Sequence, residues 1–207
     1  MSDAGPGLAA ATPLDAEDLA RANLYGLVSR LFYGPADPNL LAEIIRSGQE
    51  GEGEAKGGAL VAAWSTLRTA CAGAYPAIVR QEYDTLFVGV GKSEVTPYLS
   101  AYAEPSAPDL YLVRLRDRLT ALGLGRRESV FEVEDHISGV SDVMRWLIED
   151  RHPLEDQQRF FESFVYPGAV LFCVAVQNAS SASFYKQVAT FAQSFFELER
   201  TAFEMSG

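Results

Sequence analysis

Apolar side chains recur at every third or fourth position through most of this chain, the spacing of helices that bury one face. The first such stripe, formed by Leu24, Leu27, Val28 and Leu31, follows a capped start at residues 12–15, with Pro13 just inside the helix. Similar spacing predicts helices at about residues 38–46, 59–74, 76–87, 109–122 and 137–150 and from residue 153 onward; after a break at residues 167–168 it predicts one apolar and one amphipathic helix. The pattern predicts an all-α protein, a single-domain helical bundle of about nine to ten helices over residues 1–207.

Three segments interrupt the helical pattern. Residues 1–12 are expected to form a disordered N-terminus, and residues 47–58, rich in Gly and Glu, are expected to form a mobile surface loop. Between residues 88 and 108 the helical period fails, and Tyr98, Ser100 and Tyr102 alternate in a stretch that also holds glycines and prolines. We expect a long ordered loop there, and loops of that length inside compact domains are often functional.

The composition is that of an acidic globular protein, because 48% of the 207 residues are hydrophobic and the formal net charge is −11. Such a charge repels nucleic acid and anionic membranes and attracts basic proteins, although acidity that only maintains solubility is the alternative explanation. No apolar run approaches the roughly 20 residues that span a bilayer, so we expect no stable membrane insertion. The N-terminus lacks the basic region of a signal peptide, and Cys71 and Cys173 stand in apolar contexts, which fits a reducing cytoplasm.

The sequence offers no complete set of residues for catalysis or for a cofactor. Gly89 and Ser93 bound a segment that resembles the end of a phosphate-binding P-loop, but Leu86 stands where the first glycine belongs, after a predicted helix rather than a strand. The preferred interpretation is a turn that Gly89 permits, and a nucleotide-binding switch is the less favoured one. Neither His136 nor His152 has the Glu-x-x-His spacing of helical di-metal sites, and no Gly-x-Ser-x-Gly element is present. We therefore expect no enzyme, no metal and no other cofactor.

The stretch from residue 128 to residue 150 is strongly acidic, with seven acidic residues against one base, Arg145. On one interpretation it is a solvated helix face, whose first-turn acids Glu134 and Asp135 complement the helix dipole. On the other, the small Gly139 leaves open space beside two carboxylates, those of Asp135 and Asp142, for a guanidinium or ammonium group. His136 is then either a partly buried neighbour or a member of a binding site.

Two blocks of sequence resemble motifs of the TorD/DmsD/NarJ chaperones, the redox-enzyme maturation proteins. The block Glu132-x-x-Asp135-His136-Ile137 is similar to the family's Glu-Pro-x-Asp-His-Ile/Leu motif, with Val133 in place of the proline. Upstream, Tyr83-x-x-Leu86-Phe87-x-Gly89 and Pro97-Tyr98-x-Ser100-x-Tyr102 are similar to its Tyr-x-x-Leu-Phe-x-Gly and Pro-Tyr-Glu-Ser-x-Tyr block, with Leu99 in place of the glutamate. A third departure is Gly168, which follows Pro167 where many members have tryptophan.

The resemblance implies a TorD-like, all-helical cytoplasmic chaperone with no chemistry of its own. Such chaperones bind the twin-arginine leader peptide, and sometimes the body, of a molybdopterin oxidoreductase catalytic subunit. They hold the apoenzyme back from export until its cofactor is inserted. Members occur as monomers and as domain-swapped dimers, so both states are open. A helical scaffold or adaptor for another basic protein is the alternative function.

The resemblance also indicates which residues bind the peptide. Asp135 and His136 match the positions implicated in leader binding, and Glu132 matches the glutamate of the motif; with Glu134 they offer carboxylates to the leader's guanidinium groups. His136 either donates a hydrogen bond to the peptide or orients Asp135. The family's loop positions, which have either a structural role or contact with the leader, are matched here by Gly89, Tyr98, Ser100 and Tyr102. The loop is expected to contribute to an apolar groove for the apolar part of the leader.

Overall fold

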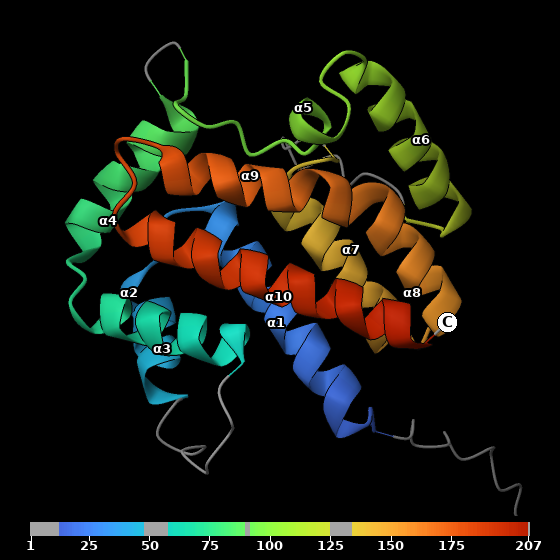
Figure 1. Ribbon diagram of the computed structural model, residues 1–207, viewed down its shortest axis with the longest axis horizontal. Helices are drawn as coiled ribbons and strands as arrows, with labels where there is room; N and C mark the ends of the chain where they lie inside the picture. The colour runs from blue at the N-terminus through green and yellow to red at the C-terminus, as the bar shows by residue number, and fades with distance from the viewer. Residues whose placement is uncertain (1–12, 48–57, 90–91, 125–133, 207) are drawn as a thin grey trace, which may run out of the picture.

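The computed structural model of the protein describes residues 13–47, 58–89, 92–124 and 134–206. Within these residues the regular elements are helices, and the only β-type pairing is an isolated bridge (Figure 1). In chain order they are α1 (Ala16–Tyr33), α2 (Pro38–Arg46), α3 (Ala59–Ala72), α4 (Pro76–Tyr83), η1 (Asp84–Val88), α5 (Ser100–Ala103), α6 (Pro108–Ala121), α7 (Ile137–Glu149), α8 (Leu154–Phe160), η2 (Phe161–Val165), α9 (Tyr166–Asn178) and α10 (Phe184–Ser206). The all-α class is confirmed. The segments expected at residues 1–12 and within 47–58 lie almost entirely outside the described residues.

Carboxylates fix the starts of two long helices. Asp15 Oδ1 accepts a hydrogen bond from the Asp18 N–H at 2.8 Å, so α1 begins after Asp15. Pro13 therefore lies before the helix, not inside it as the sequence suggested. The Glu82 carboxylate of α4 accepts hydrogen bonds from three consecutive N–H groups at the start of α10, including that of Phe184. One side chain thus ties two segments that are far apart in the sequence.

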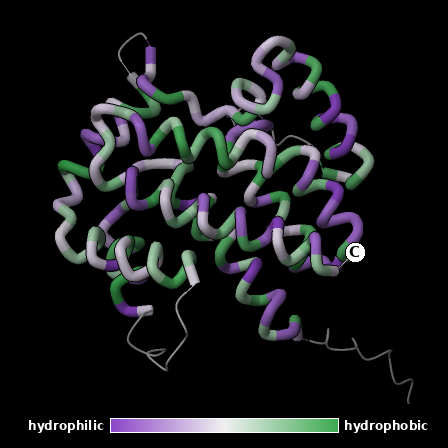
Figure 2. Tube along the Cα trace, viewed as in Figure 1, coloured by the Kyte–Doolittle hydropathy of each residue, from purple (hydrophilic) through white to green (hydrophobic). Residues whose placement is uncertain are grey.

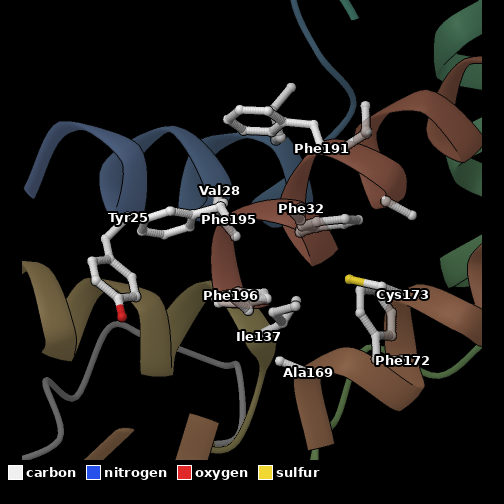
Figure 3. Packing of buried hydrophobic residues seen from close by; sticks show 14 of the residues in the cluster. Tyr25, Val28, Phe32, Ile137, Ala169, Phe172, Cys173, Phe191, Phe195 and Phe196 are labelled. Carbon is white, nitrogen blue, oxygen red and sulfur yellow. The ribbon is translucent and has the colours of Figure 1, made fainter. Parts of the chain in front are cut away.

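The core lies among α1, α7, α9 and α10. In the tube view, hydrophobic residues recur along each of these helices (Figure 2), and α1 packs along α7 while α10 packs along α9 and α3. Figure 3 shows Tyr25 of α1 beside Phe195 of α10, and their ring centroids are 4.8 Å apart in an edge-on arrangement. Ile137, the first residue of α7, belongs to the same fully buried cluster (Figure 3). Core packing therefore fixes the point at which α7 begins.

The chain does not break at Pro167 and Gly168. Residues Leu154–Asn178 form one continuous helix, in which the π-helical turn η2 ends at Val165, two residues before Pro167 in the first turn of α9. A proline removes one N–H and crowds the carbonyl four residues earlier, and a wider π turn accommodates both effects. The predicted break is therefore wrong, because the helix widens at this point instead of ending.

The helix Leu154–Asn178 is long and apolar enough to cross a membrane by length and composition alone. The expectation that no segment approaches that length is therefore wrong for this helix. Half of its most apolar window is buried inside the molecule (50%), which is also typical of the core helix of a soluble protein. Phe172 and Cys173, fully buried in this helix, lie in the cluster of Figure 3.

The segment between residues 88 and 108 is not a continuous loop. Ser100–Ala103 form the short helix α5 within it, where Tyr102 N–H and Ala103 N–H both donate to the Leu99 carbonyl. The flanking prolines explain why a helical period was not visible in the sequence, since they limit this helix to a single turn. α5 packs against α9 and α6 at the top of the view in Figure 1.

Candidate functional site

Two stretches that are far apart in the sequence, around Tyr98 and around His136, meet in an isolated antiparallel bridge. Leu99 N–H donates to the Asp135 carbonyl at 2.9 Å, and Ile137 N–H donates to the Pro97 carbonyl at 3.0 Å. The structure therefore joins the two motif blocks directly. Because Ile137 is anchored in the core, the bridge holds the upstream block against the start of α7.

The Asp135 side chain lies inside the molecule. It is 1% exposed, and its Oδ2 accepts a hydrogen bond from the Ser100 N–H, at the start of α5, at 3.0 Å. Beside Gly139 the space is limited on one side, because a Cβ at that position would stand 3.3 Å from the Glu134 carbonyl oxygen. The Asp135 carboxylate thus anchors α5 and does not stand open to a cation on the surface.

His136 is the N-cap of α7. Its Nδ1 accepts a hydrogen bond from the Ser138 N–H at 3.2 Å and lies 2.6 Å from Ser138 Oγ. An Nδ1 that accepts from an N–H carries a lone pair, so the ring proton is on Nε2. Since α7 begins at Ile137, Glu134 and Asp135 precede the helix and are not first-turn acids.

Three of the four predicted loop residues, Tyr98, Ser100 and Tyr102, take different positions. The Tyr98 ring meets the His136 ring edge-on, with centroids 5.6 Å apart, and Ser100 is buried beneath its bond to Asp135. Tyr102 faces elsewhere: its hydroxyl donates to the Thr96 carbonyl at 2.8 Å, and burial raises its pKa to about 12. Tyr102 lines a cavity of about 510 Å³ between the loop and α9. Tyr98, Ser100, Asp135 and His136 thus form one cluster, and Tyr102 lines the cavity.

That cavity is bounded by the loop on one side and by one face of α9 on the other. Val95 and Thr96 line it from the loop, and Ala175 and Asn178 line it from α9. Leu171 lies one turn before Ala175 on the same face of the helix and is 51% exposed. The result is a largely apolar surface depression next to the motif cluster.

Glu134 already forms an ion pair with a cationic side chain of the protein. Arg116 of α6 lies 3.1 Å from Glu134 Oε2, and the neighbouring Arg114 forms an ion pair with Glu104, which follows α5. The two arginines are both about half exposed (49% and 51%), so their ion pairs remain in contact with water. Acidic groups on both sides of the motif cluster are thus neutralised from one helix.

The helix that carries these arginines is peripheral. α6 stands at the edge of the molecule in Figure 1, and only Tyr111 and Leu115 of its residues are buried. The Tyr111 hydroxyl donates to the Phe164 carbonyl, and burial, followed by the charge of Asp135, raises its pKa. This hydrogen bond ties α6 to η2. Few apolar contacts hold it there.

Gly89 takes part in a separate turn. Its φ is +64°, and a Cβ at that position would stand 2.5 Å from the Lys92 carbonyl oxygen, so only glycine fits this exit from η1. The residues before it are helical, which confirms the predicted turn and does not match the strand that precedes a P-loop. Within the described residues, the nearest neighbours of a Cβ at Gly89 belong to Lys92 and Ser93 and not to the cluster around the bridge, and Glu132 lies outside those residues.

Two of the departures from the family motifs touch each other. A Cβ added to Gly168 would stand 2.7 Å from the Leu99 carbonyl oxygen and 2.8 Å from the Leu99 Cβ. Gly168 thus allows α9 to approach the backbone of the bridge closely, and a larger side chain at this position requires the loop to move. Both departures are visible in the sequence, but the contact between them is visible only in the structure.

Sequence reasoning missed the arginines of α6 as members of the site. The acidic residues follow one another along one segment, whereas the basic partners of Glu134 and Glu104 come from a different helix, α6. The available indication in the sequence was the occurrence of arginine at every second position, at Arg114, Arg116 and Arg118. Only the fold shows that two of them reach carboxylates next to the motif cluster.

Comparison with known proteins covers both motif blocks. A family model described as the nitrate reductase delta subunit matches residues 54–173, more than half of the chain. A Haemophilus influenzae protein described only as uncharacterized is 29% identical over 112 residues, which are 54% of this chain and 54% of that protein. The chain therefore spans about half the length of this curated relative. A crystal structure of a candidate redox enzyme maturation protein from Archaeoglobus fulgidus has a TM-score of 0.52 and 21% identity and covers 87% of this chain and 93% of that one. At that identity the likeness shows the helical fold alone.

Proposed function

Because the chain belongs to the nitrate reductase delta subunit family, the TorD/NarJ type of maturation protein, we propose that it is a chaperone for the catalytic subunit of a molybdopterin oxidoreductase. In this proposal it binds the subunit's twin-arginine leader and its apo-form in the cytoplasm. It thereby holds back export until the cofactor has been inserted. It performs no chemistry of its own.

The observation that carries the proposal is the bridge between the two motif blocks. Tyr98 and His136 pair directly, and the buried Asp135 carboxylate joins them to α5. Burial of a carboxylate costs free energy that its hydrogen bond to a backbone N–H offsets only in part, and this supports a role of Asp135 in fixing the geometry of the site. We assign Asp135 and His136 to the positioning of the site, beside the surface that the leader contacts.

The basic part of the leader needs carboxylates, and two are available at the edge of this cluster. Glu134 and Glu104 are held by Arg116 and Arg114, which are half exposed. A guanidinium group of the leader makes the same kind of ion pair, so it replaces an internal arginine and leaves no carboxylate unpaired. Binding is therefore an exchange of partners, with α6 as the internal competitor.

The apolar part of the leader needs a largely apolar surface nearby. The cavity beside Tyr102 provides one, with Val95 and Ala175 in its lining and Leu171 exposed along the same face of α9. A helical or extended apolar segment laid along α9 covers these side chains, which is the mode of groove recognition seen with amphipathic peptides. The two halves of the leader thus have adjacent sites.

The experiment is a titration of a fluorescent twin-arginine leader peptide into the protein. We expect saturable binding that weakens with added salt and weakens further when both arginines of the peptide become glutamine. Glu134→Gln should lower the affinity about twofold to fivefold, the range for an exposed ion pair. Glu204→Gln, which removes an exposed carboxylate at the far end of α10, is the matched control and should have no effect.

Two results would overturn the proposal. One is equal affinity for the twin-arginine peptide and its glutamine version. The other is a pull-down from cell extract in which the protein retains a basic partner but no molybdoenzyme precursor with its leader. The second result identifies the protein as a scaffold for another basic protein.

A further inference from the structure

The cavity beside Tyr102 continues into a second surface depression. This α4 depression has a volume of about 660 Å³ and is lined by α4, η1 and the turn that follows η1. Lys92 and Glu94 line both hollows, so the two are contiguous. In Figure 1 the segment from η1 to α5 runs along α9, from the α4 end of the molecule toward α5 and α6. The two hollows therefore form one groove along this segment.

Hydrogen bonds fix the junction between the two hollows. Val95 N–H donates to the Leu86 carbonyl of η1 at 2.9 Å. On the other side, the Glu94 carboxylate accepts hydrogen bonds from the Ser180 N–H at 2.6 Å and from the Ser180 hydroxyl at 2.9 Å, just beyond the end of α9. The junction is thus tied both to η1 and to the end of α9, and a ligand does not have to order it on binding.

The apolar surface of the groove extends as far as α4. Val88, the last residue of η1, lines the α4 depression and is 62% exposed. Ala77 and Gly89 add further apolar surface to the lining. Gly89 matches a loop position of the family motif but lies apart from the cluster around the bridge, and here it belongs to the groove. The apolar surface is therefore longer than the cavity beside Tyr102 alone.

The α4 depression holds two cations that are not committed to a partner. Arg80 and Lys92 line it and form no ion pair with any described residue. The acids of its lining are Asp84 and Glu94, and Glu94 is already engaged with Ser180. Two cations thus face one uncommitted acid, so this end of the groove favours a carboxylate over a further basic group. The end next to α6 has the opposite preference, since its carboxylates accept guanidinium groups.

We infer that the groove binds a client leader in one direction, an inference that rests on the proposed function. The twin arginines lie at the α6 end, and the apolar part lies beside Tyr102. The residues that follow the apolar part lie in the α4 depression, where they cover Val88 and place an acidic side chain near Lys92. The occupant of the depression is therefore an uncharged or acidic segment that continues the leader toward the mature protein.

The test is a fluorescence titration of the full-length protein with three synthetic peptides. The short peptide contains the twin arginines and the apolar segment, and the long peptide adds small apolar residues and one glutamate. The third peptide has lysine in place of this glutamate. We expect the long peptide to bind about fivefold to tenfold more tightly than the short one, because it buries additional apolar surface. The lysine version should bind about twofold to fivefold more weakly than the long peptide.

Two variants locate these effects in the α4 depression. Val88→Asn should remove most of the advantage of the long peptide, and Lys92→Gln should reduce the difference between the glutamate and lysine versions. Neither variant should change the affinity for the short peptide by more than about twofold. Leu198→Asn is the matched control, because Leu198 is an aliphatic side chain that is 51% exposed on α10 and lines neither hollow. Thermal unfolding checks that each variant is folded.

Photo-cross-linking tests the direction of the peptide. A photoreactive side chain in the added segment of the long peptide should attach to α4 or η1. One placed beside the twin arginines should attach to α6. The reverse pattern, or attachment of the added segment to α6, would overturn the inference.

Equal affinity for the short and long peptides would also overturn the inference, as would an advantage of the long peptide that Val88→Asn leaves intact. Either result leaves the proposed function standing when the short peptide binds through its arginines. If the short peptide does not bind, the proposed function fails, and the inference fails with it.

Discussion

The core and the α6 edge of this protein are held by different forces. In the core, Tyr25, Phe195 and Phe196 pack ring against ring and are almost completely buried. At the edge, α6 fully buries only Tyr111 and Leu115, with Leu119 partly buried against the core, and its other side-chain links to the body include ion pairs in contact with water. Apolar burial contributes about 1.5–3 kcal/mol for each large side chain, whereas an exposed ion pair contributes about 0–1 kcal/mol.

The difference indicates which part of the molecule can change partners. Removing a core ring leaves a cavity that nothing refills, while an arginine of α6 can be replaced by another guanidinium at little cost. The bridge around Tyr98 and His136 lies between the two regions. Its backbone is fixed by the core through Ile137, and its outer carboxylates are covered by α6. A rigid bridge beside ion pairs that can be exchanged is suited to a site that binds and releases a peptide.

The largest expected effect is in the core. Phe196→Ala should lower the free energy of unfolding by about 3–5 kcal/mol, because a fully buried ring is lost and a cavity remains. Chemical denaturation followed by circular dichroism measures the change. Leu198→Ala, on the exposed side of the same helix, is the control and should have a much smaller effect. Similar losses for both variants would contradict the description of the core.

The second prediction concerns the contact between α9 and the bridge. Gly168→Ala should destabilise the protein by about 1–3 kcal/mol, because the new Cβ would stand 2.7 Å from a backbone oxygen of Leu99. Gly34→Ala is the control, since a Cβ there meets nothing within 4 Å and its backbone is extended. Thermal unfolding of the two variants compares them directly. If Gly168→Ala is as stable as wild type, the loop that carries Leu99 can move at little cost in free energy, and the close contact does not constrain the bridge.

Asp135 is the link between the rigid and the exchangeable regions. Asp135→Ala should cost about 1–3 kcal/mol, since the buried Ser100 N–H loses its acceptor. Hydrogen exchange should show the loss at the Ser100 amide and in α5 more than in α10. Asp109→Ala, at an exposed position in α6, is the control. Unchanged protection of α5 would contradict the positioning role of Asp135.

The smallest expected effect on stability is at the edge. Arg116→Gln should change the free energy of unfolding by less than about 1 kcal/mol, because the ion pair with Glu134 is exposed to water. A double-mutant cycle with Glu134→Gln measures the coupling between the two side chains. A coupling well above that range would show that α6 is firmly fixed and is not exchangeable.

Sequence periodicity predicted most of the helices, because their buried faces repeat with the helical period, as in α1 and α7. Periodicity failed where the backbone departs from a regular α-helix and the pattern of side chains does not indicate the departure. Pro167 suggested a break, but a π turn absorbs the missing N–H. The motif around Asp135 and His136 pointed to the right segment of the chain. Burial of Asp135 and the ion pairs of α6 with Glu134 and Glu104 depend on contacts between distant segments, which local patterns do not encode.

The most direct test of the account is the affinity of a twin-arginine leader peptide for Arg116→Gln compared with wild type. If α6 competes with the leader for Glu134, the variant should bind about twofold to fivefold more tightly, although its stability hardly changes. Arg200→Gln, which breaks an exposed ion pair with Glu204 far from the bridge, should bind like wild type. Binding by Arg116→Gln that is equal to or weaker than that of wild type would contradict the exchange of partners.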